Sequence, residues 1–512
     1  MAAGILLSRI VGLVRNRTLT HYLGVSDAAD ALAAAFRIPN LLQNLFGEGA
    51  LSASFVPVYA ALRAKGEAAE ATRLAGATAA VLALLTSLLV LVGILAAPVL
   101  VDLLAPGFQG EKRALTVTLV RILFPGVGAL VLAAWCLGVL SSHRRFFLSY
   151  AAPVVWNVAI IVAVLLGGSA EGEARLAITA AWGAVAGSVL QVAIQLPGVS
   201  RLVRPIGAAI DLGSPHLRTV ARNFGPALIS RGVLQISAYV DTLVASLLPA
   251  GSAALLYFGQ MVSMLPVSLF GMAVSAAELP ELASATAAPE AATRLRERLR
   301  SGLRQIAYFV VPSAAAFVAH GDVIAAALYQ SGRFTADDSR RVWAILAASA
   351  VGLVATTAAR LYASTYYALH DTRTPMRFAL ARVGLGSAMG IAGALWLPAR
   401  LGLPAWWGVA ALPLASGMAG WVELLLLRLG IERRIGRSRV PVATTSTLWG
   451  AAAAAAASGW AVDIALGMHP PLVRAIFVLG TFGLVYLGGT AAAGVPEARG
   501  VLAAASRLGR TR

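Results

Sequence analysis

Long apolar runs, separated by short charged breaks, are the feature that most constrains this chain. A helix of about 20 apolar residues crosses the hydrocarbon core of a bilayer, and in lipid it satisfies its own backbone hydrogen bonds. We therefore expect an all-α polytopic membrane protein. The runs predict fourteen transmembrane spans at 1–23, 28–60, 74–101, 115–141, 147–168, 175–198, 218–248, 252–284, 302–329, 341–369, 376–397, 405–429, 441–466 and 471–496.

The composition also indicates lipid as the solvent. Of the 512 residues, 59% are hydrophobic and 12% are charged, which is half the charged fraction of about 25% in a soluble domain. The formal charge of +18 would suggest nucleic-acid binding in a soluble protein. In a membrane protein the arginines occupy cytoplasmic loops beside anionic headgroups, so we expect membrane lipids and no nucleic acid as partners. The single cysteine, Cys136, excludes an intrachain disulfide.

Basic residues concentrate in every second connection between the predicted spans. Arg63, Lys65 and Arg73 follow the second span, and four arginines within 294–300 follow the eighth. The alternate connections carry fewer basic residues, except the ninth, which holds Arg333, Arg340 and Arg341 beside two aspartates. The positive-inside rule places the basic connections and both termini in the cytoplasm, which agrees with an even number of spans.

Short sequence matches at a common separation predict an internal duplication. The matches join Ser8-Arg9 to Ser230-Arg231, Leu45-Phe46-Gly47 to Leu269-Phe270-Gly271, and His143 to His370, at separations of 222, 224 and 227 residues. We predict an N-lobe of six spans over 1–200, a pseudo-symmetric C-lobe of six spans over 201–430, and two further spans with a basic cytoplasmic tail over 431–512. Two such lobes around a central cavity are typical of a transporter that alternates access.

Charged residues inside the predicted spans are costly in lipid, so each needs a partner, a wet cavity or a place near an interface. Arg9 and Arg15 in the first span and Asp30 in the second are candidates for lining a cavity, with Glu48 as a balancing carboxylate. Arginine stays charged when partly buried and binds phosphate oxygens in pairs. The second lobe offers Arg231 as a candidate substrate ligand, and Asp241 and Arg360 as candidate ion or gating residues.

Motifs for catalysis or metal binding are absent from the sequence. No glycine precedes either lysine, no histidine is followed by glutamate, and no Gly-x-Ser-x-Gly elbow occurs. This excludes a Walker A loop, a His-Glu-x-x-His zinc site and a hydrolase nucleophile of that kind. We expect a transporter rather than an enzyme, with no cofactor and no metal. Its energy would come from an ion gradient, the membrane potential or the gradient of the substrate.

Several motifs resemble those of the MurJ (MviN) lipid II flippase family. They are collinear over roughly residues 5–440, and the first of them are the most specific. The motifs are Ser8-Arg9-Ile10-Val11-Gly12-Leu13-Val14-Arg15, Asp30-Ala31, Phe36-Arg37-Ile38-Pro39-Asn40-Leu41-Leu42, Glu48-Gly49-Ala50, Phe55-Val56-Pro57, Ala105-Pro106-Gly107-Phe108, Gly225-Pro226-Ala227, Gln235-Ile236-Ser237, Gly332-Arg333-Phe334-Thr335 and Asp371-Thr372-Arg373-Thr374-Pro375.

The resemblance implies the fourteen-helix fold of the multidrug/oligosaccharidyl-lipid/polysaccharide exporters. It implies a flippase in the bacterial cytoplasmic membrane that moves lipid II, the undecaprenyl-pyrophosphate-linked peptidoglycan precursor, to the outer leaflet. Arg9, Arg15 and Asp30 fall on positions that the family uses in its central cavity. Lipid II, membrane lipids and cell-wall synthesis proteins are the implied partners.

The chain departs from the family pattern at three positions. Gln43 and Met261 stand where the family usually has cavity arginines, and Asn16 replaces an acid after the second arginine of the first span. The missing cations favour, as an alternative, a flippase for another polyprenyl-linked oligosaccharide. A drug/cation antiporter of the same superfamily would need an acidic or aromatic site, and a glycan polymerase or acyltransferase would need a large outward loop with catalytic residues.

Arg231 is the repeat counterpart of Arg9 and would restore one of the missing cations from the seventh span. We therefore predict that Arg231→Ala abolishes flipping. Complementation of a MurJ-depleted strain measures this, and near-normal growth with the variant would contradict the assignment.

Overall fold

The computed structural model describes residues 2–168, 172–203, 213–272, 274–275, 278, 281–282, 290–467 and 469–510. These residues are helical apart from connections and one isolated bridge between Ser331 and Phe334. The first half contains α1 (Ala2–Leu23), α2 (Asp27–Leu42), the π-helix η1 (Gln43–Leu51), α3 (Ser52–Ala64), α4 (Ala68–Leu104), α5 (Gly110–Ser142), α6 (Phe146–Gly167) and α7 (Glu173–Leu202). The second half contains α8 (Pro215–Ser246), α9 (Ser252–Pro266), the π-helix η2 (Val267–Met272), α11 (Ala291–Tyr329), α12 (Ala336–Ala368), α13 (Arg373–Leu395), α14 (Leu397–Leu401), η3 (Ala405–Trp407), α15 (Gly408–Ile435), α16 (Val442–Leu466), α17 (Pro471–Ala492) and α18 (Pro496–Arg510).

Ten helices among the described residues are long and apolar enough to cross a membrane. Together with the shorter helices they confirm the all-helical membrane protein. Four predicted spans are not among the ten: those of α1, α2–η1–α3, α6 and α8. Charged residues lower the hydropathy of α1 and α8, the π-helix interrupts the second span, and α6 contributes a shorter apolar stretch, Ala151–Gly167.

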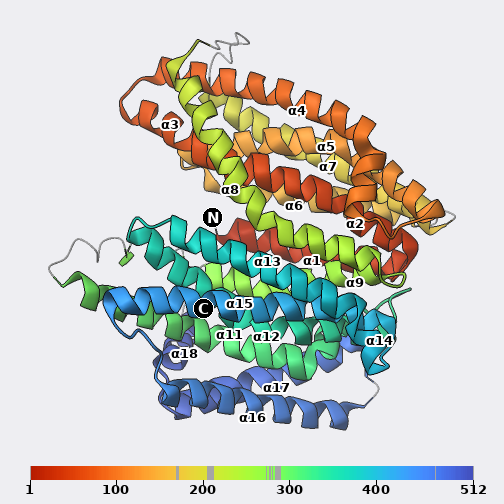
Figure 1. Ribbon diagram of the computed structural model, residues 1–512, viewed down its shortest axis with the longest axis vertical. Helices are drawn as coiled ribbons and strands as arrows, with labels where there is room; N and C mark the ends of the chain where they lie inside the picture. The colour runs from red at the N-terminus through yellow and green to blue at the C-terminus, as the bar shows by residue number, and fades with distance from the viewer. Residues whose placement is uncertain are drawn as a thin grey trace. The chain divides into compact units, whose positions relative to one another are not determined.

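Chain contacts divide the protein into two compact units. Unit 1 consists of Met1–Ala254 together with Ser331–Phe334. In it α5 packs against α2, α4 and α7, and α6 packs against α1 and α7 (Figure 1). A buried cluster that includes Phe55, Tyr59 and Trp135 joins α3 to α5. The rings of Phe55 and Tyr59 stack with centroids 5.1 Å apart.

Unit 2 consists of Leu255–Gln330 and Thr335–Arg512. The helices α11, α12, α15 and α13 pack in that order, and α16 and α17 pack on α11 (Figure 1). Polar contacts fix this last pair: the Tyr486 hydroxyl donates to the Tyr308 carbonyl oxygen at 2.7 Å, and Arg304 meets Glu497 at 2.5 Å. The final two helices are therefore anchored to the unit rather than loosely attached.

Element boundaries repeat along the chain as the predicted duplication requires. α5 and α12 begin at Gly110 and Ala336 and are both 33 residues long, so their starts and their ends are each 226 residues apart. Two residues after each helix ends, Arg144 and His370 both adopt φ of 59°, which is rare outside glycine. The π-helices η1 and η2 begin 224 residues apart. The predicted lobe boundaries at 200/201 and 430/431 stay predictions, and the contact-based division lies between Ala254 and Leu255.

The connection from α12 to α13 is held by Asp371. Its carboxylate accepts the Thr374 backbone N–H at 3.0 Å and an Arg434 N–H at 2.8 Å. These two donors lower the pKa of Asp371 to about 2, so it stays ionised throughout the neutral range. The Arg434 guanidinium also lies 5.1 Å from the centre of the Tyr366 ring. The ends of α12 and α15 are thereby tied together around one carboxylate.

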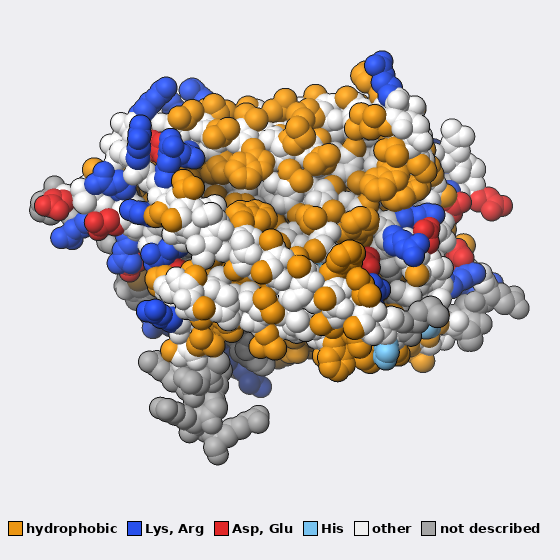
Figure 2. Space-filling view, turned by 90° about the horizontal axis from the view of Figure 1, so that it is seen from below, with side chains coloured by type: hydrophobic (Ala, Val, Ile, Leu, Met, Phe, Trp, Pro, Cys, Tyr) orange, Lys and Arg blue, Asp and Glu red, His pale blue; other side chains and the backbone are white. Residues whose placement is uncertain are grey.

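Large apolar side chains cover the surface of the last two transmembrane helices. Trp460 on α16 and Leu484 on α17 are 63% and 73% exposed. Figure 2 shows apolar side chains across the middle of the visible face and Lys and Arg towards its two ends. An apolar band between basic ends is the surface expected of a protein whose solvent is a bilayer.

Gly352 and Gly417 allow α12 and α15 to approach closely. A Cβ atom on Gly352 would lie 2.3 Å from the Gly417 Cα atom. We predict that Gly352→Ala destabilises the purified protein by about 1–3 kcal/mol, because the helices would have to separate. Gly384→Ala on α13 is the matched control, since nothing lies within 4 Å of the added methyl group. A lowered midpoint of thermal unfolding for the first variant alone is the expected result, and equal midpoints would contradict it.

Candidate functional site

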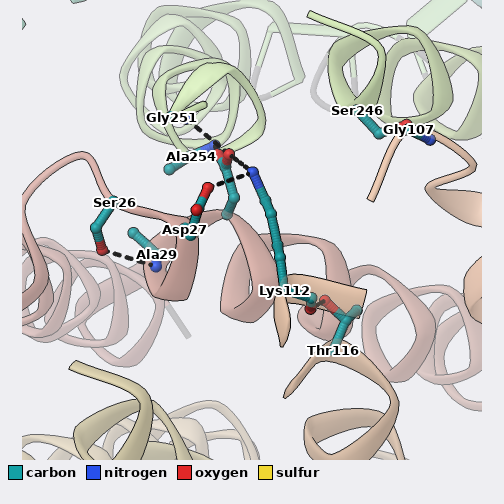
Figure 3. A network of polar contacts seen from close by, with 10 residues as sticks. Ser26, Asp27, Ala29, Gly107, Lys112, Thr116, Ser246, Gly251 and Ala254 are labelled. Atoms are coloured by element: carbon teal, nitrogen blue, oxygen red, sulfur yellow. Dashed lines mark hydrogen bonds and ion pairs between the residues drawn. The ribbon is translucent and has the colours of Figure 1, made fainter. Parts of the chain in front are cut away.

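Asp30 forms the most concentrated buried polar network of unit 1. It lies in the first turn of α2 and is 1% exposed. Its carboxylate accepts the backbone N–H groups of Gly251 and Ala254 at 2.7 and 2.8 Å. The ammonium of Lys112 donates to the same carboxylate at 2.5 Å (Figure 3). One buried negative charge is thus matched by a full positive charge and two amide donors.

Local geometry explains why the acid lies here. Gly251, with φ of 87°, makes the turn that leads into α9, and the first N–H groups of a helix have no intrahelical acceptor. The positive end of the helix dipole favours a carboxylate at that place. Asp30 therefore caps α9 from a different helix. Asp27, 2.9 Å from the Lys112 ammonium, adds a second and more exposed carboxylate to the network.

Lys112 was not among the predicted site residues. It stands near the start of α5, with its ammonium 4.4 Å from the centre of the Phe108 ring. The sequence signal was a lone lysine at the beginning of a span in a chain whose basic residues are otherwise almost all arginine. Its partner is 82 residues away, so spacing alone could not have paired them.

A second cluster holds the segment Ser331–Phe334 in unit 1. The Arg333 backbone N–H donates to the His21 carbonyl oxygen at 2.9 Å, and its guanidinium meets Glu173 at 2.6 Å. Gly332 adopts φ of 56°, and a Cβ atom there would lie 2.3 Å from the His21 carbonyl oxygen. His21, Tyr22 and Glu173 are among the residues that line a cavity of about 680 Å³ beside this segment. The motif Gly332-Arg333-Phe334 therefore has a packing role at the ends of α1 and α7.

The two arginines of α1 have different surroundings. Arg15 is 6% exposed, donates to the Asn16 side-chain oxygen at 2.8 and 3.1 Å, and lies 5.1 Å from the centre of the Trp156 ring. Arg9 is exposed. Residues six apart on a helix point about 120° from each other, so one can pack against α6 while the other is accessible. Their use in a shared cavity stays a prediction.

The remaining predicted residues lie on the helices where they were expected. Asp241 is half-buried on α8 and Arg360 is exposed on α12. Glu48 falls within η1 and Arg231 within α8, but the side chains of both lie outside the described part of the structure. No group of three His, Cys, Asp or Glu side chains that could hold a metal ion occurs among the described residues.

Comparison with known proteins identifies the family. The family model described as "Lipid II flippase MurJ" matches residues 19–485. The chain belongs to this family. Among curated MurJ relatives, the lipid II flippase of Burkholderia cenocepacia is 31% identical over 440 residues, which are 84% of this chain and 82% of that protein. The probable lipid II flippase of Rhizobium tropici is 32% identical over 440 residues, 83% of this chain and 79% of that protein.

Solved structures show the same fold. A structure named "Lipid II flippase MurJ, inward closed conformation" matches with a TM-score of 0.79 and 23% identity, covering 96% of this chain and 97% of that one. An inward-facing multidrug resistance MATE transporter of the MOP superfamily matches with a TM-score of 0.70 and 14% identity, covering 83% and 94% of the two chains. The MurJ chain therefore has the MurJ/MATE fold.

The departure at Asn16 has a direct structural meaning in this MurJ chain. The Asn16 amide oxygen accepts two hydrogen bonds from Arg15, as a carboxylate at that position could. It does so without a negative charge, so it orients the guanidinium and does not neutralise it. A substrate anion would therefore meet less competition at Arg15 than an adjacent acid would cause.

Removal of Asp30 is predicted to destabilise this MurJ protein strongly. Asp30→Ala would leave Lys112 with Asp27 alone and two helix N–H groups without an acceptor, at a cost of about 3–5 kcal/mol. Lys112→Met should cost less, because the carboxylate keeps both amide donors. Asp102→Ala, which breaks an exposed pair with Arg113, is the control. Thermal unfolding of the purified proteins gives the order, and an Asp30 variant as stable as the control would contradict it.

Proposed function

We propose that this protein moves lipid II from the inner to the outer leaflet of the bacterial cytoplasmic membrane by alternating access, as a transporter and not an enzyme. The observation that carries the proposal is the match of the lipid II flippase family model to residues 19–485. The relatives from Burkholderia cenocepacia and Rhizobium tropici support it, since each aligns over about four fifths of both chains.

The charged residues inside the helices give this function a physical basis. The sugars and peptide of lipid II cannot cross hydrocarbon unaided, because each unpaired polar group costs several kcal/mol there. A hydrated cavity removes that cost. Arg9, Arg15 and Arg231 would bind the pyrophosphate, and Asp30 and Glu48 would compensate them in the empty state. The polyprenyl tail would stay in the bilayer.

The proposed architecture has fourteen transmembrane helices in two six-helix lobes around the cavity, followed by two helices, with both termini in the cytoplasm. The ten long apolar helices account for most of these spans. The other four would be formed by α1, α2–η1–α3, α6 and α8. Polar helices are those expected next to a hydrated cavity, since they would be unstable against lipid on all sides.

Two contacts of unit 1 suit the outward closure of such a transporter. The Asp30 network holds the first residues of α9, and the Arg333 cluster holds the segment before α12. The remaining turns of α9 and α12 belong to unit 2. All these helix ends lie on the side opposite the basic connections. We propose that both contacts form when the outward side is closed and break when it opens.

Coupling and accessory partners are also proposals. Some relatives use a sodium site in the second lobe, and Asp241 matches its acid in the seventh span, but the span of α13 offers no carboxylate. We propose coupling to the membrane potential or another cation gradient, with cell-wall synthesis proteins as neighbours. A related flippase for another polyprenyl-linked oligosaccharide is the second candidate, favoured by Gln43 and Met261 at positions of cavity arginines.

Rescue of a MurJ-depleted bacterium, scored by outward exposure of lipid II, tests the proposal. The wild-type chain is expected to restore exposure, whereas Arg15→Ala should reduce it at least tenfold because a phosphate ligand is lost. Arg73→Ala, which removes an exposed pair with Glu70 on α4, should leave exposure unchanged. A well-expressed wild-type chain that restores no exposure would overturn the lipid II assignment.

A further inference from the structure

Three charged side chains of unit 2 converge inside its helices. The Arg382 Nε atom on α13 lies 3.0 Å from a Glu423 carboxylate oxygen on α15. Glu423 interacts electrostatically first with Arg382 and then with Arg360 on α12. The cluster therefore joins α12, α13 and α15, and it carries two positive charges and one negative charge.

The three residues lie at a similar depth in the membrane. Arg382 is nine residues from the start of α13, Arg360 eight from the end of α12, and Glu423 twelve from the end of α15. At 1.5 Å per residue these positions are about 12–18 Å from helix ends that are predicted to be cytoplasmic. A hydrocarbon core is about 30 Å thick, so the cluster is well inside it.

Exposure distinguishes the members of the cluster. The side chains of Arg382 and Glu423 are 24% and 13% exposed, whereas Arg360 is an exposed residue. A guanidinium at this depth is too costly to face lipid, so its open side must meet water or an anion. Arg382 contacts Glu423 as an ion pair, but its Nε atom has no hydrogen-bond partner. The guanidinium is thus held electrostatically without its donor being satisfied.

We propose that Arg360 and Arg382 form a phosphate-binding site inside unit 2, with Glu423 as an internal substitute for the anion. In the empty state Glu423 neutralises Arg382. A bound phosphate oxyanion takes its place, accepts paired hydrogen bonds from the guanidinium groups and leaves the carboxylate to water. This inference rests on the proposed function for its natural ligand, the pyrophosphate of the transported lipid. It supplies cations that Gln43 and Met261 do not.

Direct binding of inorganic pyrophosphate to the purified full-length protein in detergent tests the site. Arg382→Gln and Arg360→Gln should each weaken binding roughly 10- to 100-fold, the loss expected for hydrogen bonds to a charged group. Glu423→Gln should strengthen binding, because the competing carboxylate is gone. Arg428→Gln is the matched control, since Arg428 pairs with Glu432 at 2.9 Å on the same helix as Glu423. Binding that is unchanged in both arginine variants would overturn the site.

A purely structural ion pair is separated by the double variant Arg382→Gln/Glu423→Gln. It removes both charges together, so it should fold even if Arg382→Gln alone does not. Under the proposal it still binds pyrophosphate at least tenfold more weakly than wild type. Wild-type affinity in the double variant would show that the pair only holds helices together and would overturn the proposal.

Two further measurements identify the source of the phosphate. In nanodiscs, phosphatidylglycerol should compete with pyrophosphate poorly if the site takes the transported lipid. Competition at the level of pyrophosphate itself would replace that ligand with an ordinary headgroup and overturn the assignment. Lipid II flipping by the wild type is measured separately. Its failure, with arginine-dependent pyrophosphate binding intact, would refute the proposed function and leave the site standing.

Discussion

The energetic cost of an ionised side chain inside a bilayer governs this structure. Nearly all of the chain is apolar enough to sit in lipid, so every charge within a helix must be compensated by a partner or by water. Asp30 is compensated by Lys112 and two helix N–H groups, and Arg382 by Glu423. Arg15 is oriented by the neutral amide of Asn16. These three solutions differ in how much charge they leave over, and the charge left over is what a substrate anion can use.

The fold could be predicted because its main determinant is the length of apolar runs. That length is a local property, and each run identified in the sequence corresponds to a helical stretch. The π-helices at Gln43–Leu51 and Val267–Met272 were not predicted, since hydropathy does not distinguish hydrogen bonds to the fifth residue from those to the fourth. Their occurrence at equivalent places in both halves shows that the duplication preserved an irregularity as well as a pattern.

The candidate site was predicted less completely. Asp30 was identified from the cost of its charge, but Lys112 and Arg333 were not, because both lie near or outside the ends of spans and find partners far along the chain. Arg382 and Glu423 were also missed, although the same cost argument applied to α13 and α15 would have found them. What sequence could not supply is which distant helices bring opposite charges within 3 Å of each other.

The cap that Asp30 places on α9 has a kinetic consequence. If this carboxylate withdraws, two N–H groups and an ammonium lose their acceptor at the same moment, and water must arrive to replace it. The surrounding residues of α2, Ala28–Phe36, are nearly all buried and apolar, so solvation follows separation rather than accompanying it. The activation barrier for opening is then higher than the difference between the end states. A carrier built in this way exchanges conformations slowly, and it holds each one long enough for a bulky headgroup to leave before ions can slip through.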